Sequence, residues 1–144
     1  MKVDLNVKNL IVIALVAAAG ALGAVSRYLI SNCWIHKWSE RNLVMAAGFP
    51  FGTLCVNVLG SFVVGVVIQV HKSTGLIPEP WHTAIAIGFL GALTTFSTFS
   101  YETLYHAEAG RWSLMFANIA ANVVLCIISV WGGMTLIRAF VGSN

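Results

Sequence analysis

Four long stretches of the chain contain no charged residue, and apolar side chains fill most of each one. The stretches are Asn9–Ser26, Asn42–His71, Pro80–Tyr101 and Trp112–Ile137. A helix needs about 20 predominantly apolar residues to cross the hydrocarbon core of a bilayer, so each stretch is long enough for one crossing. The pattern therefore predicts four transmembrane helices. Their expected ranges are near Leu10–Ile30, Phe49–Val70, His82–Tyr101 and Ser113–Ile137.

The composition fits a membrane protein. Of the 144 residues, 58% are hydrophobic and only 9% are charged, whereas soluble domains carry about 25% charged residues. Aromatic residues that favour the headgroup level lie at expected helix ends, as Tyr28, Trp81 and Trp112 do. The connections are short and contain no low-complexity tract. We expect one all-α transmembrane domain over residues 1–144.

Other classes of site receive little support. The three cysteines, Cys33, Cys55 and Cys126, lack the spacing of metal ligands, and we expect them to serve packing. The four histidines occur singly in or near expected loops, so we expect no metal site from them either. The net charge of +3 comes from scattered basic residues rather than a cluster, which argues against a nucleic-acid partner. We expect no enzymatic activity.

Positively charged residues are evenly divided between the two sides of the membrane. If the helices alternate in direction, one side holds Lys2, Lys8, Lys72 and Arg138, and the other holds Arg27, Lys37, Arg41 and Arg111. The orientation of a membrane protein follows the excess of lysine and arginine on one side, so an even count favours neither orientation. We expect insertion both ways and assembly as an antiparallel, dual-topology homodimer.

Polar residues recur along two of the predicted helices and fill part of a third. The recurring positions are Thr53, Asn57 and Ser61 on the second helix, and Asn118, Asn122 and Cys126 on the fourth. The third helix carries six hydroxyl residues within Gly88–Tyr101. Polar groups at this depth can join helices through hydrogen bonds, or they can line a path for a polar solute. Two stripes and a hydroxyl run together favour the path.

The absence of acidic residues from the four stretches limits what can move along such a path. A proton-coupled exporter of drugs or cations needs a titratable group at depth, and small multidrug exporters of this size use a carboxylate in the first helix. A dual-topology exporter is therefore the alternative, and a helical scaffold without transport is a third possibility. Cation pores use acidic rings. Neutral donors and aromatic edges suit an anion better.

Three segments resemble the Fluc (CrcB) family of bacterial fluoride channels. They are GAVSRY at Gly23–Tyr28, GTLCVNVLGSF at Gly52–Phe62 and GFLGALTTFSTFS at Gly88–Ser100. The resemblance extends over all four predicted helices. It implies a dual-topology homodimer with two fluoride pores, which exports fluoride passively and so relieves its toxicity. It also implies location in the bacterial cytoplasmic (inner) membrane.

The resemblance further implies that the third helix breaks near its middle. The backbone carbonyls of Gly91 and Thr94 from both subunits would then hold a central structural sodium ion. Unwound carbonyls are tolerated at membrane depth only when protein or an ion satisfies them, so this arrangement is physically sound. Phe96 and Phe99 would present their ring edges to fluoride. Without the resemblance, both would be interpreted as ordinary core aromatics.

Donors along the fluoride path follow from the same resemblance. The candidates are the amides of Asn57 and Asn122, the hydroxyls of Thr53, Ser97 and Thr98, and the vestibule residue Arg27. For Arg27 the alternative is an interfacial arginine that extends its charge into the headgroups. Glu102 follows the third motif and matches an acidic position of the family. We expect it to accept hydrogen bonds or exchange protons near the end of the pore.

Overall fold

The structure is a computed structural model, and it describes residues 6–31 and 48–142. Throughout these residues the regular structure is helical, with no strand. Four helical segments are long and apolar enough to cross a membrane. Their ranges are Val7–Ser31, Phe51–Thr74, Glu79–Glu108 and Trp112–Val141. The prediction of an all-α membrane protein with four spans is confirmed. Lys2, Cys33, Lys37 and Arg41 lie outside the described residues.

Local signals set the ends of the first two spans. Helix α1 (Val7–Tyr28) begins after Asn6, whose side-chain oxygen accepts a hydrogen bond from the Asn9 N–H at 3.0 Å and so satisfies one free donor of the first turn. Helix α3 (Phe51–Thr74) ends at Gly75, which has a φ of 63°. Glycine adopts this left-handed conformation without a steric penalty, so it is a common helix terminator.

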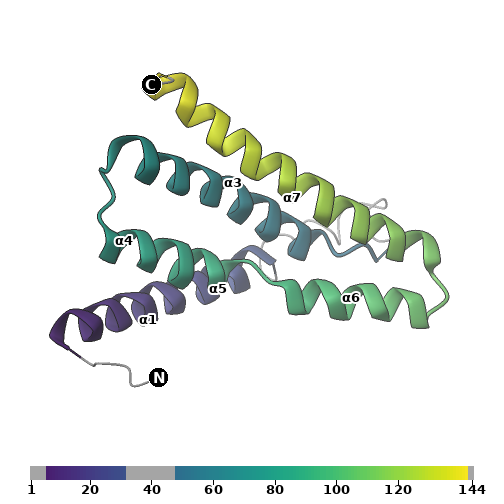
Figure 1. The fold of residues 1–144 in the computed structure, drawn as a ribbon. Coiled ribbons are helices and arrows are strands. Elements are labelled where there is room, and N and C mark those ends of the chain that lie inside the picture. Colours follow the sequence, from purple (N-terminus) through teal and green to yellow (C-terminus); the bar gives the residue numbers. More distant parts are fainter. Residues whose placement is uncertain (1–5, 32–47, 143–144) are drawn as a thin grey trace.

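The third span is built from four helical pieces. It starts with α4 (Glu79–Thr83), continues as the π-helix η3 (Ala84–Leu90) and the short α5 (Gly91–Leu93), and resumes as α6 (Phe96–Glu108). Between α5 and α6 the backbone of Thr94 and Thr95 is extended, with ψ angles of 158° and 115°. The predicted break in the third helix is therefore confirmed, and it lies at these two threonines (Figure 1).

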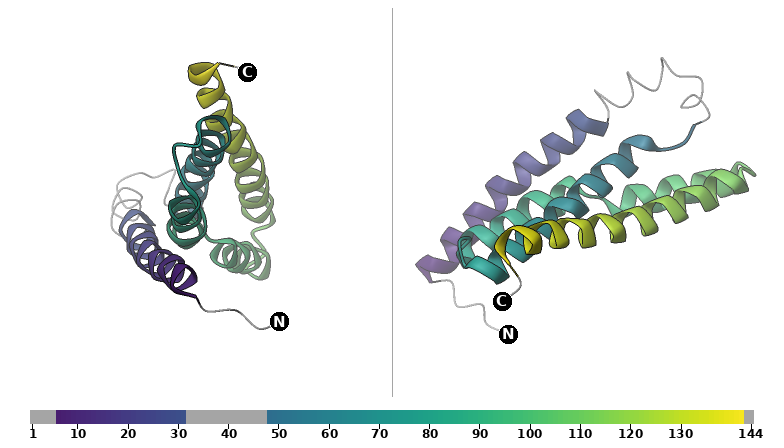
Figure 2. Two further views of the ribbon diagram at one scale, coloured as in Figure 1. Left: turned by 60° about the vertical axis from the view of Figure 1, so that its left-hand side comes forward. Right: turned by 90° about the horizontal axis from the view of Figure 1, so that it is seen from above.

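Helix α3 lies along α7 (Trp112–Val141), whereas α1 lies against η3 and α5, and α6 packs on α7 (Figures 1 and 2). Glycines allow the close approach. A Cβ atom at Gly65 of α3 would collide with the backbone carbonyl of Val130 on α7, and one at Gly23 of α1 would collide with the carbonyl of Phe89. Small residues therefore set the distances between helices, as membrane bundles require.

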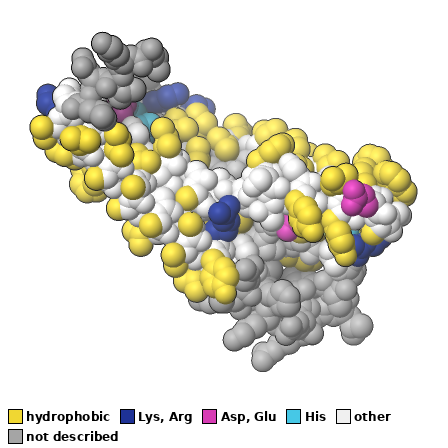
Figure 3. All heavy atoms as spheres, turned by 90° about the horizontal axis from the view of Figure 1, so that it is seen from below, with side chains coloured by type: hydrophobic (Ala, Val, Ile, Leu, Met, Phe, Trp, Pro, Cys, Tyr) yellow, Lys and Arg dark blue, Asp and Glu magenta, His cyan; other side chains and the backbone are white. Residues whose placement is uncertain are grey.

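Most apolar side chains of the single chain face outward. Among the described residues the buried hydrophobic core is small, and α1 and α7 bury little of their apolar surface. Figure 3 shows hydrophobic side chains across one face of the molecule, with few charged side chains among them. In water this surface would drive aggregation, so it is suited to lipid or to other protein chains.

The third span is longer than predicted. Its last helix continues to Glu108, whereas the sequence pattern places the end at Tyr101. The absence of charge marks the part of a helix that fits hydrocarbon, but it does not mark where the helical hydrogen bonds end. Glu102 consequently lies on α6, within a membrane-length segment, and not in a loop after it.

Candidate functional site

The side chain of Asn57 of α3 binds the extended backbone between α5 and α6. Its Oδ1 accepts a hydrogen bond from the Thr95 N–H at 2.8 Å, and its Nδ2 donates to the Thr95 carbonyl at 3.2 Å. One side chain thus satisfies both backbone polar groups of an extended residue. Such satisfaction is required wherever backbone leaves a helix at membrane depth. Asn57 therefore stabilises the extended backbone at Thr95.

The break also deprives two carbonyls of their helical donors. In a continuous α-helix, the N–H groups of Thr95 and Thr98 would donate to the carbonyls of Gly91 and Thr94, four residues earlier. Instead, the Thr95 N–H donates to Asn57, and the Thr98 N–H donates to the Thr95 hydroxyl at 3.2 Å. The two carbonyls that lose these donors are the pair predicted to hold sodium.

Amide side chains continue from Asn57 across to α7. Asn57 Nδ2 donates to Asn122 Oδ1 at 3.0 Å, and Asn122 Nδ2 donates to Asn118 Oδ1 at 2.9 Å. Asn118 Nδ2 in turn donates to the Thr103 hydroxyl of α6 at 2.9 Å. The polar stripes of the second and fourth spans therefore meet, and this network joins three helices. Asn118 is fully buried and does not line an open surface.

An open groove of about 380 Å³ lies beside the break. Four of the predicted fluoride-path residues line it, namely Asn57, Phe96, Phe99 and Asn122. The rings of the two phenylalanines are 5.4 Å apart between centroids and are inclined by 51°. The remaining lining residues are Ser61, Val64, Thr94, Thr95, Val123, Cys126, Ile127 and Val130. The groove thus combines aromatic, hydroxyl and amide groups on a mostly apolar wall.

The other predicted residues lie outside this groove. Thr53 is buried and donates its hydroxyl to Glu102 Oε1 at 2.7 Å. Ser97 and Thr98 are exposed on the first turn of α6, within hydrogen-bonding distance of the Thr95 hydroxyl, at 3.2 and 3.0 Å. Arg27 is partly buried near the end of α1. The structure therefore groups part of the predicted path, and the roles of Thr53 and Arg27 stay predictions.

Thr95 is the residue that sequence reasoning did not assign to the site. It is buried, its hydroxyl caps α6, and its backbone is held by Asn57. A usable signal was present, because threonine favours the position before a helix, where its oxygen accepts an N–H of the first turn. That preference was hidden because Thr95 belongs to a run of six hydroxyl residues.

The expectation that the histidines occur singly is wrong for two of them. His71 at the end of α3 and His82 in α4 stack with ring centroids 4.3 Å apart, and Glu79 lies beside them. The chain reverses direction between α3 and α4, so residues eleven positions apart come together. His106 lies buried in the last turn of α6, near the following loop as predicted.

Four membrane-length helices, one of them broken beside a groove of amide and aromatic groups, define an integral, multi-pass membrane protein. The family model described as "CrcB-like protein, Camphor Resistance (CrcB)" matches residues 14–134. The chain therefore belongs to the CrcB-like family, whose members are ion channels and not enzymes.

Relatives in this family are similar over nearly their whole length. A protein of Shewanella loihica is 46% identical over 129 residues, which are 90% of this chain and 95% of the relative. Proteins of Vibrio parahaemolyticus and Vibrio vulnificus are 44% and 41% identical, over 88% and 89% of this chain and 94% and 96% of their own. All three are named "Fluoride-specific ion channel FluC".

Proposed function

We propose that this protein is a fluoride-selective, passive anion channel of the bacterial cytoplasmic membrane, which exports fluoride and thereby relieves its toxicity. The observation that carries the proposal is the groove in which Phe96, Phe99, Asn57 and Asn122 converge beside the break. Relatives named as fluoride channels support the same function.

The chemistry of the groove suits a small anion. A phenyl edge carries the positive end of the ring quadrupole, so Phe96 and Phe99 can attract a halide without a fixed charge. Asn57 Nδ2 already donates to two protein oxygens, so a direct bond to an anion requires exchange of one of them. Outside the groove, on the first turn of α6, the exposed hydroxyls of Ser97 and Thr98 can replace part of the water around fluoride. Weak neutral contacts at several points allow both entry and release.

We further propose that the channel is an antiparallel homodimer with two pores. In the single chain the groove is open on one side, and Gly91, Ser97 and Thr98 are exposed in the middle of the third span. Hydroxyl and carbonyl groups facing hydrocarbon are costly, whereas a second protein chain can satisfy them. The even division of basic residues supports the antiparallel arrangement.

A central sodium ion fits the residues at the break. The carbonyls of Gly91 and Thr94 lack their helical donors, because Asn57 and the Thr95 hydroxyl take those N–H groups. Among the described residues, a Cβ atom at Gly91 would meet only the Ala86 carbonyl, at 3.8 Å, so a second copy can approach this point. Bound there, sodium would supply positive charge between the two anion paths, and carbonyl oxygen is a suitable ligand for a hard cation.

Fluoride efflux from liposomes tests the function. Purified protein in vesicles loaded with potassium fluoride should release fluoride when a potassium ionophore balances charge, and release little chloride from matched vesicles. Phe96→Ile should reduce fluoride efflux at least about 10-fold, equivalent to about 1.4 kcal/mol. Phe140→Ile is the matched control, because the two side chains are similarly exposed, at 79% and 80%, and Phe140 does not line the groove.

Two results would reject the proposal. Efflux that needs an imposed proton gradient would indicate a coupled exporter, and Glu102 in the third span is the carboxylate that such a mechanism would use. No fluoride movement at all from correctly assembled protein would indicate a scaffold. Unchanged efflux in Phe96→Ile would reject the pore assignment alone.

A further inference from the structure

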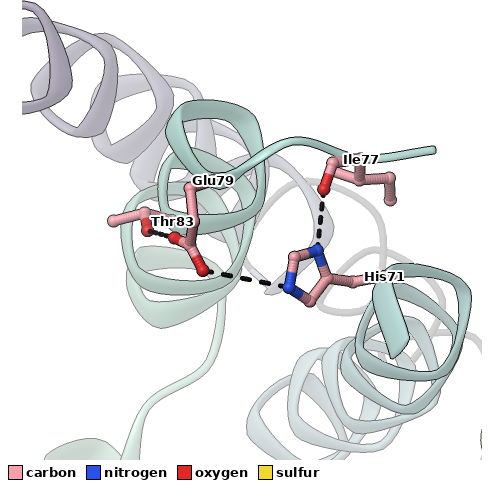
Figure 4. Close-up of polar contacts among 4 residues, drawn as sticks. All are labelled: His71, Ile77, Glu79 and Thr83. Carbon is pink, nitrogen blue, oxygen red and sulfur yellow. Dashed lines mark hydrogen bonds and ion pairs between the residues drawn. The ribbon is translucent and has the colours of Figure 1, made fainter. Parts of the chain in front are cut away.

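Three potential metal ligands meet where α3 ends and α4 begins, at the end of the bundle away from the α6–α7 turn. They are His71, Glu79 and His82, and one ligand atom from each lies within 4.8 Å of the others. Figure 4 shows the His71 ring between the Ile77 carbonyl and the Glu79 carboxylate. The cluster is distant in sequence from the break and takes no part in the groove.

The hydrogen bonds of His71 leave one ring nitrogen available. Its Nδ1 lies 2.7 Å from the backbone carbonyl of Ile77, and because a carbonyl only accepts, Nδ1 must carry the hydrogen. In the neutral ring, Nε2 is then a bare lone pair, and it faces Glu79 Oε1 at 3.8 Å. A cation between these two atoms can bind both the lone pair and the carboxylate oxygen, as a proton on Nε2 would in the ion pair.

The groups around the cluster orient it as outer partners orient metal ligands. The Ile77 carbonyl fixes the His71 tautomer, which is the usual arrangement for a metal-binding histidine. The Thr83 hydroxyl donates to Glu79 Oε2 at 3.1 Å and leaves Oε1 facing the histidine (Figure 4). His82 stacks on His71 with an angle of 22° between the rings. His71 and Glu79 are thus each oriented by a hydrogen bond, and His82 is placed by its ring contact with His71.

The three ligand atoms would need to move only a short distance to coordinate one tetrahedral metal ion. Ligand atoms about 2.0–2.2 Å from a tetrahedral ion are roughly 3.4 Å from one another, and the separations here are at most 4.8 Å. The Glu79 side chain is 73% exposed and that of His71 is 30% exposed, so both can shift toward an ion. Water can occupy the remaining position.

We propose that His71, Glu79 and His82 bind a divalent transition-metal ion of the zinc type. Two imidazoles and one carboxylate form a ligand set that zinc accepts, whereas magnesium and calcium prefer oxygen alone. The bound ion joins the end of the second span to the start of the third and fixes the angle between them. This site does not depend on the proposed fluoride conduction.

Titration calorimetry of the intact, purified protein with Zn²⁺ alone tests the proposal. We expect one binding event per chain. His82→Asn should weaken it at least about 100-fold, since losing a group that only orients a ligand typically costs 10–100-fold. Glu79→Gln should weaken it at least about 10-fold, because the amide keeps the shape and removes the charge. Co²⁺ bound in place of Zn²⁺ should give the visible absorption of a tetrahedral nitrogen–oxygen site.

Lys72→Gln is the matched control, because Lys72 is exposed beside His71 and is not a ligand. It should bind Zn²⁺ as the wild type does. Size-exclusion chromatography of each variant shows whether the protein is still assembled. His82 is a safer residue to substitute than His71, because the His71 ring donates the hydrogen bond to the Ile77 carbonyl of the connecting loop. Absence of Zn²⁺ binding in the wild type, or equal binding in the wild type and His82→Asn, would overturn the proposal.

Discussion

Asn57 is the residue whose loss should most directly disturb the break in the third span. Asn57→Leu keeps a similar volume and removes three hydrogen bonds, two to the backbone of Thr95 and one to Asn122. Each such bond contributes about 0.6–1.5 kcal/mol in proteins and membrane bundles. The three together predict a loss of about 2–4 kcal/mol, concentrated at Thr95.

Hydrogen exchange measured by mass spectrometry in micelles checks this expectation. The Thr95 N–H is protected in the wild type by its bond to Asn57, and a local loss of 2 kcal/mol should accelerate its exchange about 30-fold. Ser61→Ala is the matched control, because Ser61 lies one turn further along α3 and lines the groove without joining this network. It should leave exchange at Thr95 unchanged.

The refuting result is equal protection of Thr95 in Asn57→Leu and Ser61→Ala. It would mean that the Thr95 N–H has another acceptor. The candidate is the Gly91 carbonyl, which accepts this N–H in a continuous α-helix. The extended conformation at Thr95, with φ near −150° and ψ near 115°, would then be independent of Asn57.

The remaining predictions concern helix packing, the part-buried hydrogen bond between Thr53 and Glu102, and the proposed sodium ion. Gly65→Ala should lower the free energy of unfolding by about 1–3 kcal/mol in chemical unfolding, because its methyl group meets the Val130 carbonyl. Gly132→Ala is the control, since a Cβ atom there meets no described atom within 4 Å, and equal stabilities of the two variants would contradict this packing. Thr53→Val should lower the free energy of unfolding by about 1–3 kcal/mol, because it removes the hydroxyl that donates to Glu102. Thermal unfolding measures this change. If Thr53→Val destabilises the protein no more than a typical surface substitution does, the hydrogen bond between Thr53 and Glu102 contributes little. Replacing sodium by a large organic cation should weaken dimer association and fluoride efflux together, and full efflux without sodium would exclude the proposed ion.

The sequence pattern located the spans well because the hydrophobic effect acts on every residue of a span, and one charge is enough to mark its limit. It failed at the end of the third span, since α6 continues past Glu102 to Glu108. There the Thr53 hydroxyl from α3 donates to Glu102 Oε1, whereas Oε2 is buried without a hydrogen-bond partner among the described residues. A contact between residues 49 positions apart leaves no local trace in the sequence.

In the candidate site, too, the sequence predicted what depends on local spacing and missed what depends on contacts between residues far apart in the chain. Spacing by four residues correctly placed Asn57 and Asn122 on single helix faces, and these faces meet. It did not show that Asn57 binds the backbone of Thr95, because that depends on how α3 packs against a broken helix. The pairing of His71 with His82 was missed for a related reason, since a chain reversal and not a spacing brings them together.

The break and the proposed pore are parts of one structural feature. Because α6 begins at Phe96, directly after the extended residues, the conformation at Thr95 sets the direction of the helix that carries Phe96 and Phe99. The same conformation removes the helical donor from the Gly91 carbonyl. A change that restored a continuous helix would therefore displace both rings and satisfy that carbonyl at once. The proposed anion path and the proposed cation site should accordingly be lost together in Asn57→Leu, and not one without the other.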